Sequence, residues 1–293
     1  MHQDIQVLKS ALDQSVNFTY RAPNFFSFES RYVRREQAYF ITYLSSQSGC
    51  DQACRMCWLT NSGQNKLDNA TFEDFMKQSA LVMEYYDKTE KADLVHFNFM
   101  ARGEALNNPL IRVDSARLLN ALKQQADERD LKSKFLISTI LPRSLGDLSL
   151  MDIFPEVHPE IYYSLYSMKP EFRKRWLAKA HPAEHGLEML KAWQEATGKT
   201  PKIHFAFIEG QNDSEQDMEL IGNAINAVGL KCNLNIVRYN PYDARYGQEP
   251  EEAVIHRNTD LLTSLIKPEA VRIVPRVGKD VFASCGTFIE VAK

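Results

Sequence analysis

Short apolar segments alternate with longer amphipathic ones along most of this chain, and that alternation is the strongest constraint on its fold. The apolar segments have the length of strands and cover residues 38–44, 94–100, 134–140, 161–166, 202–209 and 232–239, with 271–275 as a further candidate. Helical periodicity lies between them, over residues 71–87, 109–128, 183–197, 213–228 and 252–266. Thr71 is placed to cap the first of these helices. Repeated strand–helix units build a parallel sheet covered by helices, so six strands predict a partial (β/α)6 TIM-like barrel.

Length and composition fit one such barrel. The chain has 293 residues, of which 44% are hydrophobic and 25% charged, and its formal net charge is −3. This is an ordinary globular composition, and no run of about 18 apolar residues predicts a transmembrane span. The first residues lack the apolar core of a secretory signal. We expect a short helical N-terminal extension over residues 1–28, a barrel domain over residues 29–293, a cytoplasmic location and no membrane partner.

The five cysteines are an odd and sparse set, which argues against a secreted disulfide framework. Three of them, Cys50, Cys54 and Cys57, lie in the segment GCDQACRMC with spacing C-x3-C-x2-C. Three interpretations are open. Free thiols can pack as small hydrophobic groups, although polar residues surround these three. Structural zinc needs four ligands, so its fourth would come from a distant part of the chain. A cubane iron–sulfur cluster held by three thiolates would leave one iron open for another ligand.

Small and polar residues follow the predicted strands at the end where a barrel carries its chemistry. Gly103 and Glu104 follow the second strand, and a glycine there lets the backbone approach a ligand closely. A turn with a surface glutamate is the simpler interpretation of that pair. The same rim also receives residues from strands three, four and six, namely Ser138, Ser164, Leu165, Tyr166 and Asn235. Cys285 stands in a C-terminal segment, ASCG, that has the composition of a loop.

Together these residues resemble the RlmN/Cfr family of radical S-adenosylmethionine (SAM) enzymes, which methylate carbon 2 or carbon 8 of an RNA adenine. The resemblance runs from about Glu29 to Val291. It implies a 4Fe–4S cluster on Cys50, Cys54 and Cys57, with SAM chelating the open iron. It also implies SAM contacts at the positions that match the family's motifs, namely Gly103, Glu104, Ser138, Ser164, Leu165, Tyr166 and Asn235. Leu141 replaces a glycine of the family's pattern, and Tyr166 replaces a histidine.

The resemblance implies that Cys285 carries the methyl group. In the family, a first SAM methylates this cysteine by displacement, which requires a thiolate. A second SAM yields the 5′-deoxyadenosyl radical, which takes a hydrogen from the new methyl group, and the resulting carbon radical adds to the adenine. Glu29 matches a catalytic glutamate of the family by a weaker alignment. An RNA substrate (rRNA or tRNA) and an electron donor such as flavodoxin or ferredoxin are the implied partners.

The chain departs from the family at the step that releases the product. The family releases the covalent RNA adduct with a second cysteine, and Tyr43 stands at that position here. A phenol cannot form a disulfide. An external thiol or Cys232 could resolve the adduct, the substrate could differ and need no resolving thiol, or turnover could be lost. Cys232 opens an apolar strand and is best interpreted as a buried structural thiol.

Only about 25 residues precede Glu29, where the family has an RNA-binding extension. Two basic groups could replace its phosphate contacts: one contains Arg31, Arg34 and Arg35, and the other spans residues 169–179. A solvated helix face is the alternative interpretation of the second group. The predicted function is radical SAM methylation of an RNA adenine. The alternatives are a related radical SAM enzyme with another substrate, and a non-catalytic iron–sulfur protein that binds nucleic acid.

Overall fold

The computed structural model describes residues 5–23 and 26–289, which form one ten-stranded sheet with its strands in sequence order. The strands are β1 (Gln6–Lys9), β2 (Val16–Arg21), β3 (Ser27–Glu36), β4 (Tyr39–Tyr43), β5 (Leu94–Phe99), β6 (Lys132–Thr139), β7 (Glu160–Tyr163), β8 (Lys202–Phe205), β9 (Asn233–Val237) and β10 (Val271–Val274). Strands β1 to β4 pair antiparallel, and β4 to β10 pair parallel. The predicted partial barrel is confirmed, and residues 271–274 add a seventh parallel strand to it.

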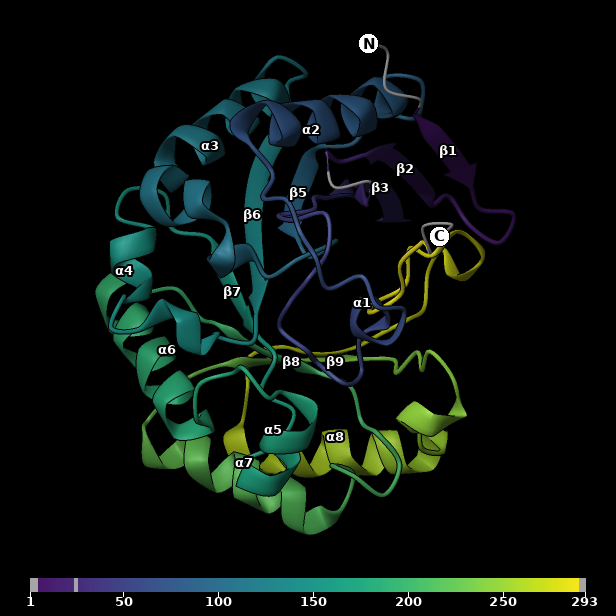
Figure 1. The fold of residues 1–293 in the computed structure, drawn as a ribbon. Coiled ribbons are helices and arrows are strands. Elements are labelled where there is room, and N and C mark those ends of the chain that lie inside the picture. The colour runs from purple at the N-terminus through teal and green to yellow at the C-terminus, as the bar shows by residue number, and fades with distance from the viewer. Residues whose placement is uncertain (1–4, 24–25, 290–293) are drawn as a thin grey trace.

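Helices cover the outer face of the curved parallel sheet, and the first and last parts of the described chain lie on the same side of the molecule (Figure 1). They are α1 (Trp58–Asn61), α2 (Phe72–Tyr86), α3 (Pro109–Asp127), α4 (Leu150–Ile153), α5 (Pro170–Trp176), α6 (Ala183–Thr197), α7 (Glu215–Ala227) and α8 (Glu252–Ile266). Short 3-10 helices span Ala105–Asn107, Arg143–Leu145, Ala244–Tyr246 and Lys279–Val281. Within the described ranges, no helix combines the length and the apolar character needed to cross a lipid bilayer.

The expected helix caps and boundaries are largely confirmed. The Thr71 hydroxyl accepts a hydrogen bond from the Asp74 amide at 3.2 Å, and the Asp74 carboxylate accepts one from the Thr71 amide at 3.0 Å, which is a capping box. Two strands end earlier than predicted, because β7 stops at Tyr163 and β8 at Phe205. Tyr166 has a φ of +59°, in the left-handed region, so an extended strand cannot continue through it.

The expected helical N-terminal extension is wrong for the described residues. Residues 6–9 and 16–21 form an antiparallel hairpin that pairs with β3 and so extends the barrel sheet. In β2 the buried residues Val16, Phe18 and Tyr20 alternate with Asn17 and Thr19, which is a strand period. Asn17 and Thr19 are buried too, so the polar half of the pattern does not mark a solvent face. The division of the chain at residue 28 stays a prediction.

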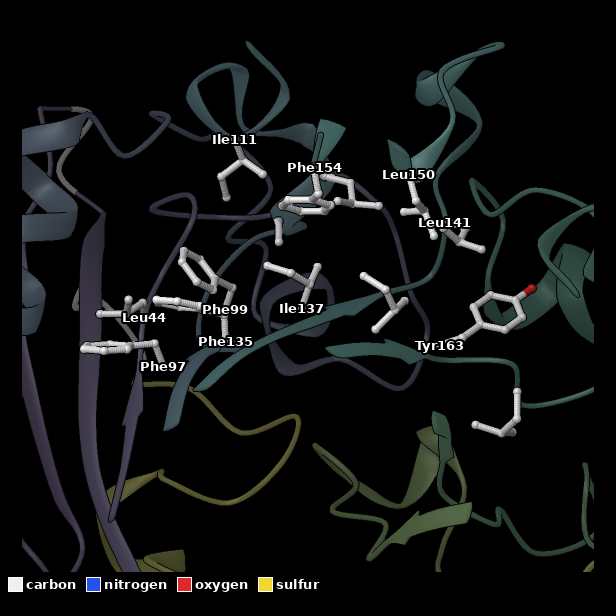
Figure 2. Packing of buried hydrophobic residues seen from close by; sticks show 14 of the residues in the cluster. Leu44, Phe97, Phe99, Ile111, Phe135, Ile137, Leu141, Leu150, Phe154 and Tyr163 are labelled. Atoms are coloured by element: carbon white, nitrogen blue, oxygen red, sulfur yellow. The ribbon is translucent and has the colours of Figure 1, made fainter. Parts of the chain in front are cut away.

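One large apolar core fills the space between the sheet and the outer helices. Figure 2 shows Phe97, Phe99, Phe135 and Ile137, which extend from β5 and β6 toward side chains of the helical layer such as Ile111 and Phe154. The rings of Phe97 and Phe135 stack with centroids 5.6 Å apart. Burying this aromatic and branched surface stabilises the parallel strands, and the strands in turn fix the positions of the loops at their C-terminal ends.

Candidate functional site

A pocket of about 150 Å³ lies at the C-terminal ends of the parallel strands and gathers most of the predicted site residues. Its lining includes Cys50, Cys54, Cys57, Gly103, Glu104, Ser138, Ser164 and Tyr166. These residues come from the loops after β4, β5 and β7 and from the end of β6. The structure therefore brings together eight residues that the sequence predicts for one site. Leu165 is buried and does not line the pocket.

The cysteine loop leaves β4 and is held by backbone hydrogen bonds. The Cys50 amide donates to Gln64 O at 3.0 Å, and the Cys57 amide donates to Cys54 O at 3.0 Å. The residue before Cys50 must be a glycine, Gly49, because a Cβ at that position would lie 2.2 Å from Lys66 O. Burial raises the pKa of all three thiols, and a bound metal centre would act in the opposite direction, because metal ligation requires the thiolate.

The three loop cysteines share one pocket but do not form a recognisable site for a single metal ion within the described residues. Among the described residues, no three His, Cys, Asp or Glu side chains converge as ligands of one metal ion. A cubane binds each thiolate through a different iron, so its ligands are spread more widely than the four ligands of a zinc ion. Cys50, Cys54 and Cys57 nevertheless line one pocket, together with Met56 and Phe288. The arrangement suits a three-thiolate cluster with one open iron.

Gly103 and Glu104 form a tight turn beside the cysteine loop. Gly103 has a φ of +94°, and a Cβ there would lie 2.7 Å from both Gln47 Cβ and Ser46 Oγ. Burial raises the pKa of Glu104 to about 7, against opposing hydrogen bonds from its surroundings. Its carboxylate accepts hydrogen bonds from the amides of Leu106, at 3.2 Å, and Ile140, at 3.1 Å. A buried acceptor of this kind suits an ammonium group, as the resemblance implies for SAM.

The segment after β6 shows the local consequence of the departure at residue 141. Leu141 has a φ of +52°, in the region that favours glycine, and its side chain is buried in the core. The Leu141 amide donates to Thr139 Oγ1 at 2.8 Å, which supports the unusual backbone. Leucine gains apolar burial at a position where glycine would relieve the backbone strain, and Ser138, three residues earlier, lines the pocket.

A second, larger cavity of about 580 Å³ lies inside the barrel and has Cys285, Tyr43, Asn235 and Ser138 in its wall. Ser138 lines both spaces. Asn235 lies away from the small pocket, and its amide is hydrogen-bonded to His204 Nδ1 at 2.7 Å. Its predicted contact with SAM stays a prediction. Tyr43 and Cys285 line the same cavity, so residue 43 lies where the family's resolving thiol would be needed.

The loop that carries Cys285 is fixed to the barrel through its backbone. Cys285 O accepts a hydrogen bond from Asn240 Nδ2 at 3.0 Å, and Gly286 O accepts one from the Trp58 amide at 3.2 Å. Cys285 is exposed, and it lines the barrel cavity. The desolvation of its thiol raises the pKa to about 11, while the charges of Arg31 and Arg35 act in the opposite direction. Cys285 also acts electrostatically on Tyr166 of the small pocket, so its thiol lies near both spaces.

Glu29, the predicted catalytic glutamate, lies in a fully buried ion-pair cluster and lines neither cavity. Its carboxylate lies 2.8 Å from Arg31 Nη2 and 2.7 Å from Arg102 Nε. Burial by itself would raise the pKa of Glu29, but these two guanidinium groups outweigh burial and hold the pKa below its ordinary value. A catalytic role for Glu29 therefore stays a prediction.

The same cluster holds the end of the Cys285 loop. The Glu29 carboxylate accepts from the Ile289 amide at 3.0 Å, Arg31 donates to Thr287 O at 2.8 Å, and Arg102 donates to Ile289 O at 2.6 Å. We name Glu29, Arg31 and Arg102 the buried clasp. Sequence reasoning missed Arg102 altogether. The spacing of Glu29 and Arg31 is the one local signal, because residues two apart on a strand share a face.

The basic groups in the sequence are largely engaged in internal contacts. Arg31 belongs to the buried clasp, and Arg34 donates hydrogen bonds to Glu90 O and Lys91 O. In the second group, Arg173 is buried against backbone carbonyls, Lys169 pairs with Asp217 at 3.0 Å, and Lys179 pairs with Asp51 at 3.2 Å. Lys174 and Arg175 remain exposed on α5. This segment therefore favours the interpretation as a structural helix with a solvated face.

Comparison with known proteins supports the resemblance. No family model matches the chain. It is 25% identical over 248 residues to a probable dual-specificity RNA methyltransferase RlmN from Prochlorococcus marinus (strain NATL2A), covering 83% of this chain and 65% of that protein. It is 25% identical over 297 residues to the corresponding protein of Lachnospira eligens, covering 97% of this chain and 77% of that one. The chain spans about two thirds of the length of the Prochlorococcus relative.

Solved structures agree with the fold. A radical SAM methyltransferase from Sphaerobacter thermophilus superposes with a TM-score of 0.78 at 16% identity, covering 97% of this chain and 80% of that one. HydG, a maturase of the FeFe hydrogenase, superposes with a TM-score of 0.56 at 10% identity, covering 82% of this chain and 52% of that one. The predicted fold class and the predicted resemblance are confirmed: the chain has the fold of a radical SAM methyltransferase, and its sequence is similar to RlmN-type dual-specificity RNA methyltransferases.

Proposed function

We propose that this protein is a radical SAM enzyme that methylates an adenine carbon of RNA, with Cys285 as the methyl carrier. The observation that carries the proposal is that Cys285 and the three loop cysteines open onto two spaces with a shared wall. Cys50, Cys54 and Cys57 would hold a 4Fe–4S cluster, which with bound SAM would supply radical chemistry, and an external donor such as flavodoxin or ferredoxin would supply the electron. The similarity to RlmN-type proteins supports RNA as the substrate. We propose a cytoplasmic location together with that substrate.

The residues of the small pocket have separate tasks in this proposal. Cys50, Cys54 and Cys57 hold the cluster, because all three line one pocket. Glu104 binds the SAM ammonium group, and Ser138 and Ser164 offer hydroxyl groups to the rest of SAM. Met56 and Phe288 exclude water from the site. Cys285 lies on the substrate side, where its thiol can accept and pass on a carbon.

Tyr43 favours one alternative within the same chemistry. It lines the cavity that Cys285 lines, and it cannot form the disulfide that releases the family's product. A radical SAM enzyme with another substrate needs no such disulfide. Cys232 is only 4% exposed, because its side chain is packed in the main hydrophobic core. It lines neither cavity, so it is not placed to resolve an adduct at Cys285. If the substrate is an RNA adenine, we therefore expect an external thiol to complete turnover.

Intact-mass analysis and peptide mapping test the carrier chemistry. The protein is reconstituted anaerobically with iron and sulfide, incubated with SAM and digested. We expect one methyl group on Cys285, and methylated adenine in RNA after reduction with an added thiol. Cys285→Ala is the matched variant: it should keep its iron and produce no methylated RNA.

Two results would count against the proposal in different ways. Protein that cleaves SAM but leaves Cys285 unmodified would retain the radical SAM assignment and remove the methyl carrier. Protein that binds iron or zinc without releasing 5′-deoxyadenosine would support a non-catalytic binding protein instead.

A further inference from the structure

Arg35 occupies an irregular position in β3 that turns its side chain into the barrel. The pairing of β3 with β4 runs regularly up to Arg34 opposite Phe40 and resumes with Glu36 opposite Tyr39. Arg35 is therefore the extra residue of a β-bulge. Bulges occur next to active sites, where they change the direction of a side chain. The preceding residue, Arg34, binds carbonyl oxygens outside the cavity, whereas Arg35 lines the cavity that contains Cys285.

The guanidinium of Arg35 has no partner among the described residues. Its Nε is buried without a hydrogen bond, and no described carboxylate lies within ion-pair distance of it. The other cations of the wall are engaged: Lys202 pairs with Glu160 at 3.1 Å, and Arg272 pairs with Glu36 at 3.6 Å. An unpaired charge in a partly enclosed site is costly to hold, so its retention there points to a ligand of opposite charge.

Among the described residues, Arg35 supplies the uncompensated positive charge of the cavity. The wall contains five other Arg and Lys residues, and each has an ion-pair partner: Arg31, Lys202, Arg238, Arg272 and Arg276. The two histidines of the wall do not add to this charge, because burial lowers the pKa of His96 and of His204 to about 4. Asn98, which is 4% exposed, has a side-chain oxygen without a hydrogen-bond partner among the described residues.

Arg35 lines the same cavity as Cys285, although its strand position, beside Tyr39 and Phe40, is near the start of β4. Tyr162 of β7 and His204 of β8 also line this cavity. Desolvation is the main cause of the raised pKa of Cys285, and the charge of Arg35 acts against it. A volume of about 580 Å³ is within the range of small-molecule sites and is large enough for a nucleotide.

We propose that the barrel cavity admits the nucleotide that reacts at Cys285, and that Arg35 binds its phosphate. The inference rests on the proposed function, since it names the substrate group that this site recognises. Arginine suits the task because its planar guanidinium can donate two parallel hydrogen bonds to phosphate oxygens. Asn98 offers a hydrogen-bond acceptor in the same wall for an amino group of the base. The phosphate can belong to a free nucleotide or to a nucleotide within single-stranded RNA.

Isothermal titration calorimetry on the anaerobically reconstituted protein tests the proposal. S-adenosylhomocysteine is added at saturation so that the SAM pocket is filled. The probes are adenosine, adenosine 5′-monophosphate and a short adenine-containing single-stranded RNA. Arg35→Gln is compared with Arg175→Gln, which removes the same charge from the exposed face of α5. Iron content and the unfolding temperature of each variant show whether it has folded and loaded its cluster.

We expect wild type and Arg175→Gln to bind the monophosphate or the RNA, and Arg35→Gln to bind that probe about tenfold more weakly or worse. The affinity for adenosine, which has no phosphate, should change little in Arg35→Gln. If Arg35→Gln weakens binding of the monophosphate, the site takes free nucleotides. If it weakens binding of the RNA alone, the site takes nucleotides within an RNA chain. Equal binding of both phosphate probes to folded wild type and Arg35→Gln, or binding to neither, would overturn the phosphate site.

A separate readout distinguishes this result from failure of the proposed function. Release of 5′-deoxyadenosine by the wild type tests the radical chemistry without reference to Arg35. Wild type that cleaves SAM while Arg35→Gln binds nucleotides unchanged would overturn the phosphate site and leave the enzyme assignment standing. Phosphate binding that depends on Arg35, in protein that never cleaves SAM, would support the site and remove the enzyme assignment.

Discussion

Arg102 Nε lies 2.7 Å from Glu29 Oε1, and both side chains are completely buried. The pair links β3 to the loop after β5, and Arg102 also donates to Ser48 O at 2.9 Å and to Gln64 Oε1 at 2.6 Å beside the cysteine loop. Through Ile289, the same two residues hold the end of the Cys285 loop. The buried clasp thus sets the relative positions of the cysteine loop and the Cys285 loop.

Glu29→Gln should destabilise the protein by about 3–5 kcal/mol, because it leaves the charges of Arg31 and Arg102 buried without their counter-ion. Chemical denaturation measures the loss. The folded fraction should also react faster at Cys285 with iodoacetamide, since the loop loses its contact at Ile289. Glu252→Gln, which removes a surface ion pair with Arg238, is the control and should change neither quantity appreciably. Wild-type stability in Glu29→Gln would contradict a structural role for the clasp.

Gly103→Ala should weaken SAM binding and lower the free energy of unfolding by about 1–3 kcal/mol. The new Cβ would lie 2.7 Å from Ser46 Oγ and from Gln47 Cβ, in the turn beside Glu104. Gly146→Ala is a matched control, because Gly146 also has a positive φ, +58°, but has no atom within 4 Å of an added Cβ. Equal losses in the two variants would show that backbone conformation, and not the close approach, decides the effect.

Cys54→Ala should prevent assembly of the cluster, since only two of the three loop thiolates remain. Iron and sulfide content should fall toward background, and reduction with SAM should release no 5′-deoxyadenosine. Cys232→Ala removes a buried thiol outside the pocket and should retain its iron. SAM cleavage by Cys54→Ala at the wild-type rate would refute the cluster assignment.

SAM affinity should rise with pH through about 7, the pKa to which burial raises Glu104. Below that pH the carboxyl is protonated and cannot pair with the SAM ammonium group; above it the carboxylate is ionised. Binding measured between about pH 5.5 and 7.5 stays below the range in which an α-amino group loses its proton. Glu104→Gln should bind SAM weakly and with a flatter pH dependence. A pH dependence identical to that of the wild type would assign the titration to another group.

The stability of the SAM-free protein should change in the opposite direction. The pKa of Glu104 is raised in the folded state, so the folded protein binds more protons than the unfolded chain between about pH 4.3 and the folded pKa. This group therefore contributes less stability as the pH rises through that interval. Glu104→Gln should remove that part of the pH dependence, as measured by urea denaturation at a series of pH values.

The parallel half of the fold could be predicted from the sequence because its signals are local. Helices α6 and α8 have the predicted bounds, and the cysteine spacing, Gly103 and Glu104 identify one rim of the barrel. Buried apolar stripes repeat within a single helix or strand, so a short window of residues contains the whole pattern. The same holds for Thr71, whose capping partner lies three residues away.

The antiparallel hairpin and the buried clasp could not be predicted in this way. Asn17 is buried because Glu29 and Val281 O accept its hydrogen bonds, and Val281 lies far away in the sequence. Nothing in the local sequence distinguishes Arg102 from a surface arginine, because residues 29, 48, 64 and 289 surround it only in the folded chain. The direction of the Arg35 side chain depends on a β-bulge, and the alternation of apolar and polar residues in the sequence does not reveal a bulge. Each of these residues owes its environment to tertiary contacts alone.

The contacts between the hairpin and the C-terminal segment also set an order of events during folding. Ser10 Oγ donates to Asp280 at 2.7 Å, and the Gly278 amide donates to Asp13 at 2.7 Å, so the partners lie about 270 positions apart. Contacts of such long range form late, because the loop between the partners must first become ordered. In a growing chain, Cys50, Cys54 and Cys57 are synthesised well before Cys285. If these three hold the proposed cluster, their loop is open to iron and sulfide before the C-terminal segment packs against the hairpin.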